Sequence, residues 1–318
     1  MESEQRESGP KDAVVPNLPN EFSLWSSGQK AACEQLLEVA ETFFDLRWES
    51  LGAMRPRLDT LVVGPTGMGK SHLVRVVSRK LGIPILRLSF GEWLVTGSRE
   101  TPRTLDRVHA FVEEHPVGII HIDELDKIRS TLTSDWSTSV LVELFLLLDR
   151  SLQQPTRTYI WTGHLQEKLQ RSFLMVGCGT WQAMWAERNK RPIGFHPSTG
   201  SSHGLVQREI ANRSVIPDEL LRRFSSRLII LPPPTEEDYR EGAKAFGLDR
   251  MAKDLGVSIN YTEATEGGLG ARWLEEKLGD LLRLAKRTGK SLFPAAETTP
   301  PEPSDLDVED DPSYEEPF

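Results

Sequence analysis

Short apolar runs alternate with amphipathic stretches along the first three quarters of the chain. Five runs have the length and composition of buried strands: 60–63, 84–88, 117–123, 172–177 and 227–231. Helices are predicted where apolar residues recur at intervals of three and four: 27–51, 70–81, 102–114 and 137–150. Strands that alternate with helices predict an α/β fold, in which a parallel sheet has helices on both faces.

The chain changes character after the proline run at 232–234. Apolar periodicity over 236–255 and 271–288 predicts a small all-helical domain. Beyond 292 the composition turns to Pro, Glu, Asp and Ser, which bury too little apolar surface to become ordered. We therefore expect four parts: a disordered arm (1–21), a large α/β domain (22–234), a small helical domain (235–292) and a disordered acidic tail (293–318).

Charge and composition narrow the possible partners. The net charge of −9 equals the charge of the tail, where residues 295–318 hold nine acidic side chains and no basic one; −9 − (−9) leaves a body near 0. A body with so little net charge gives no electrostatic footprint for strong nucleic-acid binding, although it permits a local basic patch. The chain has no run of about 18 apolar residues and no signal-like start, so we expect a cytoplasmic protein without a membrane span. Its two cysteines, Cys33 and Cys178, lack the spacing of a disulfide framework or a zinc module.

One glycine-rich segment has a complete phosphate-binding pattern. Residues 64–71 (GPTGMGKS) fit G-x-x-x-x-G-K-[ST] between a predicted strand and a predicted helix, which is the context the motif requires. The glycines let backbone N–H groups point at phosphate oxygens, while Lys70 supplies positive charge and Ser71 can ligate Mg²⁺. The candidate residues for binding ATP are Gly64, Pro65, Thr66, Gly67, Met68, Gly69, Lys70, Ser71 and the adjacent His72.

A second signal lies one strand–helix repeat later. The apolar run 117–123 ends in Asp123, and Glu124 follows it directly. In P-loop ATPases the first of two such carboxylates holds the metal, and the second is placed to polarise the attacking water. An apolar strand that ends in two acids is also common as a solvated strand end. After a complete P-loop, however, the pair predicts that Asp123 and Ser71 bind Mg²⁺ and that Glu124 is catalytic.

These motifs resemble those of the AAA+ ATPases, and within them the ATPase core of the ClpX unfoldases of the Clp/HslU branch. The matching segments are 27–30 (SGQK), 119–128 (IIHIDELDKI), 173–180 (FLMVGCGT), 193–195 (IGF) and 216–219 (IPDE). The resemblance covers about residues 22–290 and lacks the amino-terminal zinc domain of ClpX. It implies a P-loop AAA+ sheet, a helical lid formed by the small domain, Mg-ATP as the ligand, and a hexameric ring of identical subunits.

The resemblance also implies three further roles in the site. Arg222 and Arg223 lie where the family has its arginine finger, which reaches the γ-phosphate bound by a neighbouring subunit, and Arg223 is the preferred candidate. Without the resemblance, two adjacent arginines would be interpreted as a solvated turn. Arg272 corresponds to the sensor-2 arginine of the lid, and Thr180 is the only strong hydrogen-bonding side chain near the sensor-1 position.

Two segments bear on what the ATPase would act on. An unfoldase grips its substrate with a loop after the second strand, and here residues 90–97 offer Trp93 or Leu94; packing of Phe90 and Trp93 into the core is the alternative. In ClpX the tripeptide formed here by Ile193, Gly194 and Phe195 docks a peptidase, although it could equally anchor a loop to its own domain.

The resemblance therefore favours a ClpX-like remodeller or unfoldase that acts on a protein client or adaptor. The weak pore loop and the missing recruitment domain favour an ATP-dependent switch or assembly scaffold that does not thread its substrate. Remodelling of nucleic acid is a third class, which the near-neutral body of the chain disfavours.

Overall fold

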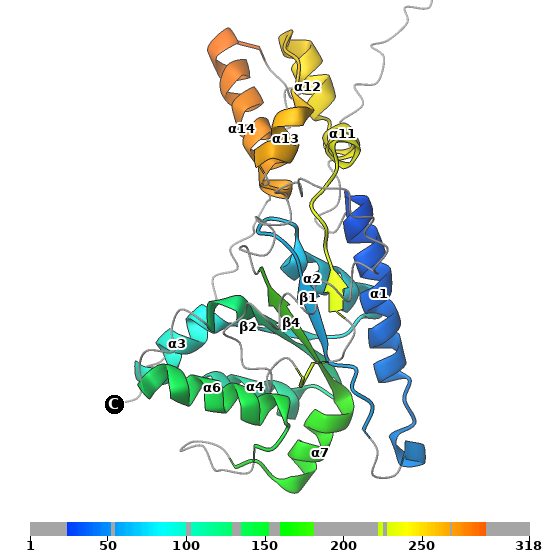
Figure 1. Cartoon of the computed structure of the whole chain (residues 1–318), viewed down its shortest axis with the longest axis vertical. Coiled ribbons are helices and arrows are strands. Elements are labelled where there is room, and N and C mark those ends of the chain that lie inside the picture. The colour runs from blue at the N-terminus through cyan, green and yellow to red at the C-terminus, as the bar shows by residue number, and fades with distance from the viewer. Residues whose placement is uncertain are drawn as a thin grey trace, which may run out of the picture.

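The structure, a computed structural model, places a parallel sheet beneath a group of helices (Figure 1). It describes the following residues: 24–51, 55–99, 103–128, 135–152, 160–180, 222–224, 228–267 and 269–290. The sequence-predicted segments 193–195 and 216–219 lie outside these ranges. Within the described ranges, no helix is both long enough and apolar enough to cross a bilayer.

Five strands form the sheet, in the order β2-β3-β4-β1-β5, and every neighbouring pair is parallel. They are β1 (Thr60–Val63), β2 (Ile85–Ser89), β3 (Gly118–Asp123), β4 (Phe173–Gly179) and β5 (Leu228–Ile230). All five predicted strands are present, so the α/β prediction is confirmed. Because the strands are parallel, their carboxyl ends meet at one edge of the sheet, which is where ligands bind in open α/β folds.

Helices cover both faces of the sheet (Figure 1). One face carries α1 (Ser27–Phe44) and α2 (Lys70–Leu81), and the other carries α3 (Phe90–Arg99), α4 (Thr104–Glu114), α6 (Asp135–Leu148) and α7 (Gly163–Ser172). Alternate strand residues serve the two cores: Ile119 packs with α1 and α2, while Ile120 packs with the opposite helices. Helix α1 ends at Phe44, earlier than predicted, and a short 3-10 turn, η1 (Trp48–Leu51), follows.

The segment after β2 is a helix and not the loop that the sequence predicted. Helix α3 begins at Phe90, which is 1% exposed, and Trp93 is also 1% exposed. The indole Nε1 of Trp93 donates a hydrogen bond to Glu143 Oε2 of α6 at 2.9 Å. Leu94 is half-buried and packs against the same core. The packing alternative is therefore confirmed, and the interpretation of Trp93 as an exposed gripping residue is wrong for this structure.

A buried ion pair joins two strands at the edge of the sheet opposite their carboxyl ends. Arg150 donates to both carboxylate oxygens of Asp59, at 2.6 and 2.8 Å, and the two side chains are 13% and 8% exposed. Arg150 also donates to Phe173 O at 3.2 Å, and Asp59 Oδ1 accepts from Met175 N at 2.9 Å. The pair thus fixes the residue before β1 to the start of β4.

The carboxyl-terminal helices form a separate small core. They are α11 (Glu236–Ala245), α12 (Leu248–Leu255), α13 (Tyr261–Gly267) and α14 (Ala271–Thr288). The single helix expected over 236–255 is two helices, because Gly247 adopts a left-handed φ of 71° that ends one and starts the next. Tyr239 and Trp273 are the aromatic centre of this core, with ring centroids 5.3 Å apart. Figure 1 shows the group directly above the carboxyl edge of the sheet.

Candidate functional site

The phosphate-binding loop joins β1 to α2 at the carboxyl edge. Its tight path needs left-handed backbone at Gly67 (φ 81°) and Gly69 (φ 84°), which glycine adopts at little cost. Lys70 is only 8% exposed, and its Nζ donates to the carbonyls of Gly64 and Pro65 at 2.8 Å each. Burial lowers the pKa of Lys70 from its ordinary value. The ammonium is thus held at the centre of the loop.

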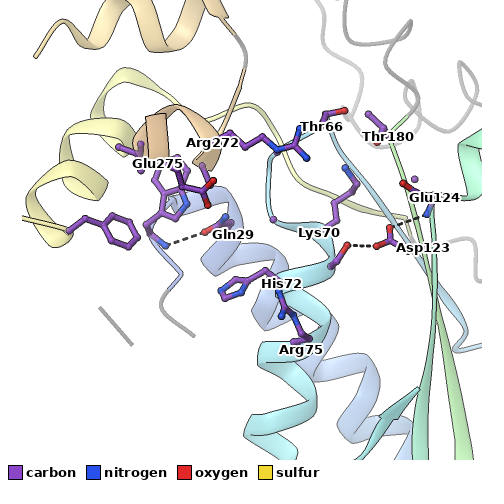
Figure 2. Close-up of a pocket in the computed structure, with 18 of the residues that line it drawn as sticks. Gln29, Thr66, Lys70, His72, Arg75, Asp123, Glu124, Thr180, Arg272 and Glu275 are labelled. Atoms are coloured by element: carbon purple, nitrogen blue, oxygen red, sulfur yellow. Dashed lines mark hydrogen bonds between the residues drawn. The ribbon is translucent and has the colours of Figure 1, made fainter. Parts of the chain in front are cut away.

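The two predicted metal ligands are already in contact. Ser71 Oγ donates to Asp123 Oδ2 at 2.5 Å, and Asp123 Oδ1 accepts from Glu124 N at 2.9 Å (Figure 2). Burial acts to raise the pKa of Asp123, but the Ser71 hydrogen bond and the charges of His121 and Arg87 outweigh it, so the pKa lies below its ordinary value. An ionised carboxylate beside a hydroxyl is a donor set that Mg²⁺ accepts.

Arg87 is a site residue that sequence reasoning missed. Its Nη2 lies 3.0 Å from Asp123 Oδ2, the oxygen that also accepts from Ser71. Arg87 comes from the edge strand β2, where Ser89 pairs in register with Asp123. The guanidinium therefore occupies part of the approach that a metal would take to Asp123. Only the strand order, with β2 beside β3, would have revealed it from sequence.

Glu124 is held by two neighbours on the same side of the sheet. Its Oε2 accepts from Ser89 Oγ at 3.1 Å, and its Oε1 accepts from Lys127 Nζ at 2.5 Å. The residue has a left-handed φ of 63°, which is uncommon outside glycine and typical of strained site positions. Each carboxylate oxygen of Glu124 thus accepts one hydrogen bond and keeps a further lone pair to which a water molecule can donate.

Thr180 follows β4 and lines the same cavity as Glu124. Its backbone N–H donates to Asp126 Oδ1 at 2.9 Å, which ties the end of β4 to the turn after β3. Thr180 therefore lies in the position predicted for a sensor-1 residue, beside the carboxylates (Figure 2).

The small helical domain touches the phosphate-binding loop directly. Ala271 N, at the start of α14, donates to Gly67 O at 3.1 Å. A Cβ on Gly67 would lie 2.2 Å from Leu269 O, so the two backbones meet without room for a side chain. Arg272 extends from the same end of α14 toward Lys70 and Thr66 (Figure 2). The arginine predicted from the lid therefore does reach the loop.

These groups surround one cavity of about 630 Å³. On the small-domain side the lining is mainly apolar, with Trp25, Phe246, Leu248, Leu274 and Leu278. Gln29 joins the two sides, because its Nε2 donates to Met68 O at 2.9 Å and its Oε1 accepts from Trp25 N at 3.1 Å. His72 also lines the cavity, as predicted. A volume of this size with one apolar and one cationic end fits a nucleoside triphosphate.

The two candidate finger arginines lie elsewhere. Arg223 donates from Nε and Nη2 to the Asp149 carboxylate at 2.5 and 2.6 Å, and its guanidinium lies 4.5 Å from the centroid of the Phe145 ring. Arg222 is exposed, and its carbonyl accepts from Arg57 Nη1 at 2.8 Å. Neither belongs to the described residues that line the cavity of their own subunit.

Residues 60–179 match the family described as "ATPase family associated with various cellular activities (AAA)". This range runs from the first residue of β1 to the last residue of β4 and includes the loop, Asp123 and Glu124. The chain carries an AAA ATPase domain. The sequence prediction is thereby confirmed at the level of this domain, while the ClpX branch stays a prediction.

The chain also has distant relatives among characterised proteins. The chain is 30% identical over 248 residues to the 26S proteasome regulatory subunit 6B homolog of Schizosaccharomyces pombe, covering 70% of this chain and 63% of that protein. It is 33% identical over 119 residues to the ATP-dependent zinc metalloprotease FtsH of Corynebacterium glutamicum, covering 36% of this chain and 14% of that protein. The chain thus spans less than two thirds of either relative. Domain III of the Thermotoga maritima replication initiation protein DnaA aligns with a TM-score of 0.46 and 17% identity. The alignment covers 86% of this chain and 90% of that one.

Proposed function

We propose that the chain binds Mg-ATP in the cavity between the sheet and the small helical domain, and hydrolyses it. The observation that carries the proposal is the convergence of Lys70, Ser71, Asp123, Glu124 and Arg272 on one cavity of about 630 Å³. Lys70 and the loop N–H groups bind the phosphates, Ser71 and Asp123 hold the metal, and Arg272 contacts the phosphates from the lid. Bound Mg²⁺ would neutralise charge that develops on the phosphates.

Glu124 has the part of orienting and polarising the attacking water. In the structure its two oxygens accept from Ser89 and Lys127, so the residue is held ready beside the cavity but engaged elsewhere. Each oxygen keeps a second lone pair to which the attacking water can donate. Hydrolysis therefore depends on Glu124, and nucleotide binding does not require it.

Replacing Glu124 with Gln tests this division of labour. We expect Glu124→Gln to bind a fluorescent ATP analogue within about twofold of wild type, because Lys70 and the loop N–H groups that bind the phosphates are unchanged. We expect its hydrolysis rate to fall by about 10²–10⁴-fold, the range for loss of a general base. Glu275→Gln is the matched control, since Glu275 lines the same cavity on the lid side. Normal turnover by Glu124→Gln would remove the assignment.

A ring of identical subunits is the second part of the proposal. Arg222 or Arg223 would complete the site of the neighbouring subunit, and the Arg223–Asp149 ion pair would have to open if Arg223 serves. Mixing two inactive proteins tests this: Lys70→Ala supplies the arginine but no ATP site, and Arg223→Ala supplies the reverse. Activity that reappears on mixing supports action between subunits. The same experiment with Arg222→Ala decides which of the two arginines acts.

We further propose that the ATPase remodels a protein client, as a ClpX-like machine would. Two of its relatives, a 26S proteasome regulatory subunit 6B homolog and the ATP-dependent zinc metalloprotease FtsH, support a role in protein turnover for this class of domain. The burial of Trp93 favours the second candidate, a nucleotide-dependent switch or scaffold, because it removes the main aromatic candidate for gripping a polypeptide. Electron microscopy of Glu124→Gln with ATP and cross-linked client separates the two. Polypeptide density in the ring axis supports threading, and client bound only at the periphery refutes it.

Docking of a peptidase through Ile193, Gly194 and Phe195 remains a proposal based on the resemblance alone. It predicts that a peptidase ring captured by the wild-type protein is lost with Phe195→Ala. Capture that is insensitive to this substitution would contradict it.

A further inference from the structure

A histidine and a cysteine face each other beneath the phosphate-binding loop. His121 Nε2 of β3 and Cys178 Sγ of β4 lie 3.2 Å apart, and both side chains are fully buried. Whichever way their hydrogen bond runs, His121 Nδ1 is buried without a hydrogen-bond partner among the described residues. An unsatisfied polar atom at such a depth costs roughly 1–3 kcal/mol. No second hydrogen bond among the described residues therefore fixes the imidazole, and Nε2 is the ring atom that faces the thiol.

Asp123 completes a group of three. One ligand atom each from His121, Asp123 and Cys178 can be chosen so that all lie within 4.8 Å of one another. Asp123 and Gly179 line the nucleotide cavity, so the group lies next to the cavity floor. The proposed hydrolysis uses Asp123 alone and assigns no part to the imidazole or the thiol.

We propose that these three side chains form a second metal site, which takes a thiophilic divalent ion of the zinc class. Mg²⁺ prefers oxygen ligands only, whereas sulfur, nitrogen and carboxylate oxygen together suit Zn²⁺ or Co²⁺. Three protein ligands leave the fourth tetrahedral position open toward the cavity. Binding displaces the thiol proton of Cys178 to solvent and leaves a metal–thiolate bond.

The histidine–cysteine pair needs only a small adjustment. Tetrahedral bonds of about 2.3 Å to sulfur and about 2.0 Å to nitrogen hold those two atoms about 3.5 Å apart. The present Nε2–Sγ separation is 3.2 Å, so the pair must open by a few tenths of an ångström. The local sequence spacing of zinc modules is absent, because neighbouring strands and not one loop bring the ligands together.

The site would act on the ATPase through its shared ligand. Asp123 cannot hold Mg²⁺ and the second ion with the same oxygens, so the two metals compete. This consequence rests on the proposed function, whereas the binding of a thiophilic ion does not. Zinc is thus expected to raise the Mg²⁺ concentration needed for half-maximal hydrolysis.

Cobalt titration of the full-length protein without nucleotide tests the site. Co²⁺ bound to thiolate gives a near-ultraviolet charge-transfer band, and tetrahedral Co²⁺ gives intense visible bands. We expect both in the wild type and in Cys33→Ser, the matched control, because Cys33 is a buried thiol of α1 that is not one of the three grouped ligands. We expect Cys178→Ser to lose the charge-transfer band and His121→Asn to weaken Co²⁺ binding at least about tenfold.

The outcomes separate the two proposals. A wild-type protein without the charge-transfer band, or a band that persists in Cys178→Ser, overturns the metal site. If Cys178→Ser fails to fold by circular dichroism, Cys178→Ala and His121→Asn carry the same comparison. ATP hydrolysis is measured separately on metal-free wild-type protein with Mg²⁺. A cobalt band with no hydrolysis would leave the metal site standing and refute the proposed function.

Discussion

The contact between Gly67 and Gly270 gives a sharp test of how the lid contributes to nucleotide binding. Gly270 has φ 61° and ψ −134°, and an added Cβ would lie 2.6 Å from Gly67 O. Gly256, in the same small domain, has φ 75°, and no atom lies within 4 Å of an added Cβ. Alanine at either position brings backbone strain of about 1–3 kcal/mol. Only Gly270→Ala also separates the lid from the loop.

The expected loss of affinity follows from the contacts that this separation breaks. The Ala271 N–Gly67 O hydrogen bond contributes about 1 kcal/mol, and partial misplacement of Arg272 removes about another 1 kcal/mol. A total of about 2 kcal/mol corresponds to an affinity about thirtyfold weaker. Gly256→Ala should bind as the wild type does, because its strain is remote from the cavity.

The assay is a titration with a fluorescent ATP analogue in the presence of Mg²⁺, with thermal unfolding measured on the same samples. Both variants should be destabilised, Gly270→Ala the more because of its added backbone contact, but only Gly270→Ala should bind weakly. Equal affinity for the two variants would refute the reasoning, because the lid contact would then contribute nothing to binding.

Three other predictions concern charged groups at or near the sheet. Burial lowers the pKa of His121 from its ordinary value of 6.5 to about 4. The unfolded chain therefore binds more protons than the folded chain between pH 6.5 and pH 4. Unfolding free energy should therefore fall by up to about 3 kcal/mol from pH 7 to pH 4, and urea titrations of His121→Asn should show a flatter profile. Arg150→Met leaves its buried aspartate unpaired and should cost about 3–5 kcal/mol in the same titrations, whereas Arg283→Met, at an exposed ion pair, should cost less than about 1 kcal/mol. Arg87→Gln removes an exposed ion-pair partner from Asp123, the proposed metal ligand. The Mg²⁺ concentration that half-saturates binding of the ATP analogue should therefore fall about two- to fivefold. An unchanged concentration would refute competition between the guanidinium and the metal.

Local patterns in the sequence predicted the framework of the site well. The strand 60–63, the glycine loop and the helix that starts at Lys70 are all present, because each depends on residues close together in the chain. The apolar run that ends at Asp123 was equally clear, since a strand buried on both faces reads as continuous hydrophobicity. Helix boundaries were predicted less well. The periodic stretch 236–255 was predicted as one helix, but it is divided into two at Phe246–Gly247.

The parts that the sequence did not reveal depend on pairing between distant segments. Arg87 meets Asp123 only because β2 lies beside β3, and the pairing of Asp59 with Arg150 spans 91 positions. A helix and not a loop begins at Phe90, because its aromatic side chains pack into a core to which α6 contributes. Such contacts follow from strand order and helix packing, which apolar periodicity alone does not determine.

The path from β5 to the small domain has a mechanical consequence. Leu231 N donates to Val63 O, so the last strand is fastened to the strand that precedes the phosphate loop, and prolines 232–234 then restrict the backbone that enters α11. The last helix of the small domain contacts the phosphate-binding loop at its start, through Gly270. Helix α14 has 18 residues and is about 27 Å long, so a tilt of about 10° at its first residue moves its far end by about 5 Å. A helix of this length thus turns a small change of angle beside the loop into a displacement of several ångströms at its far end.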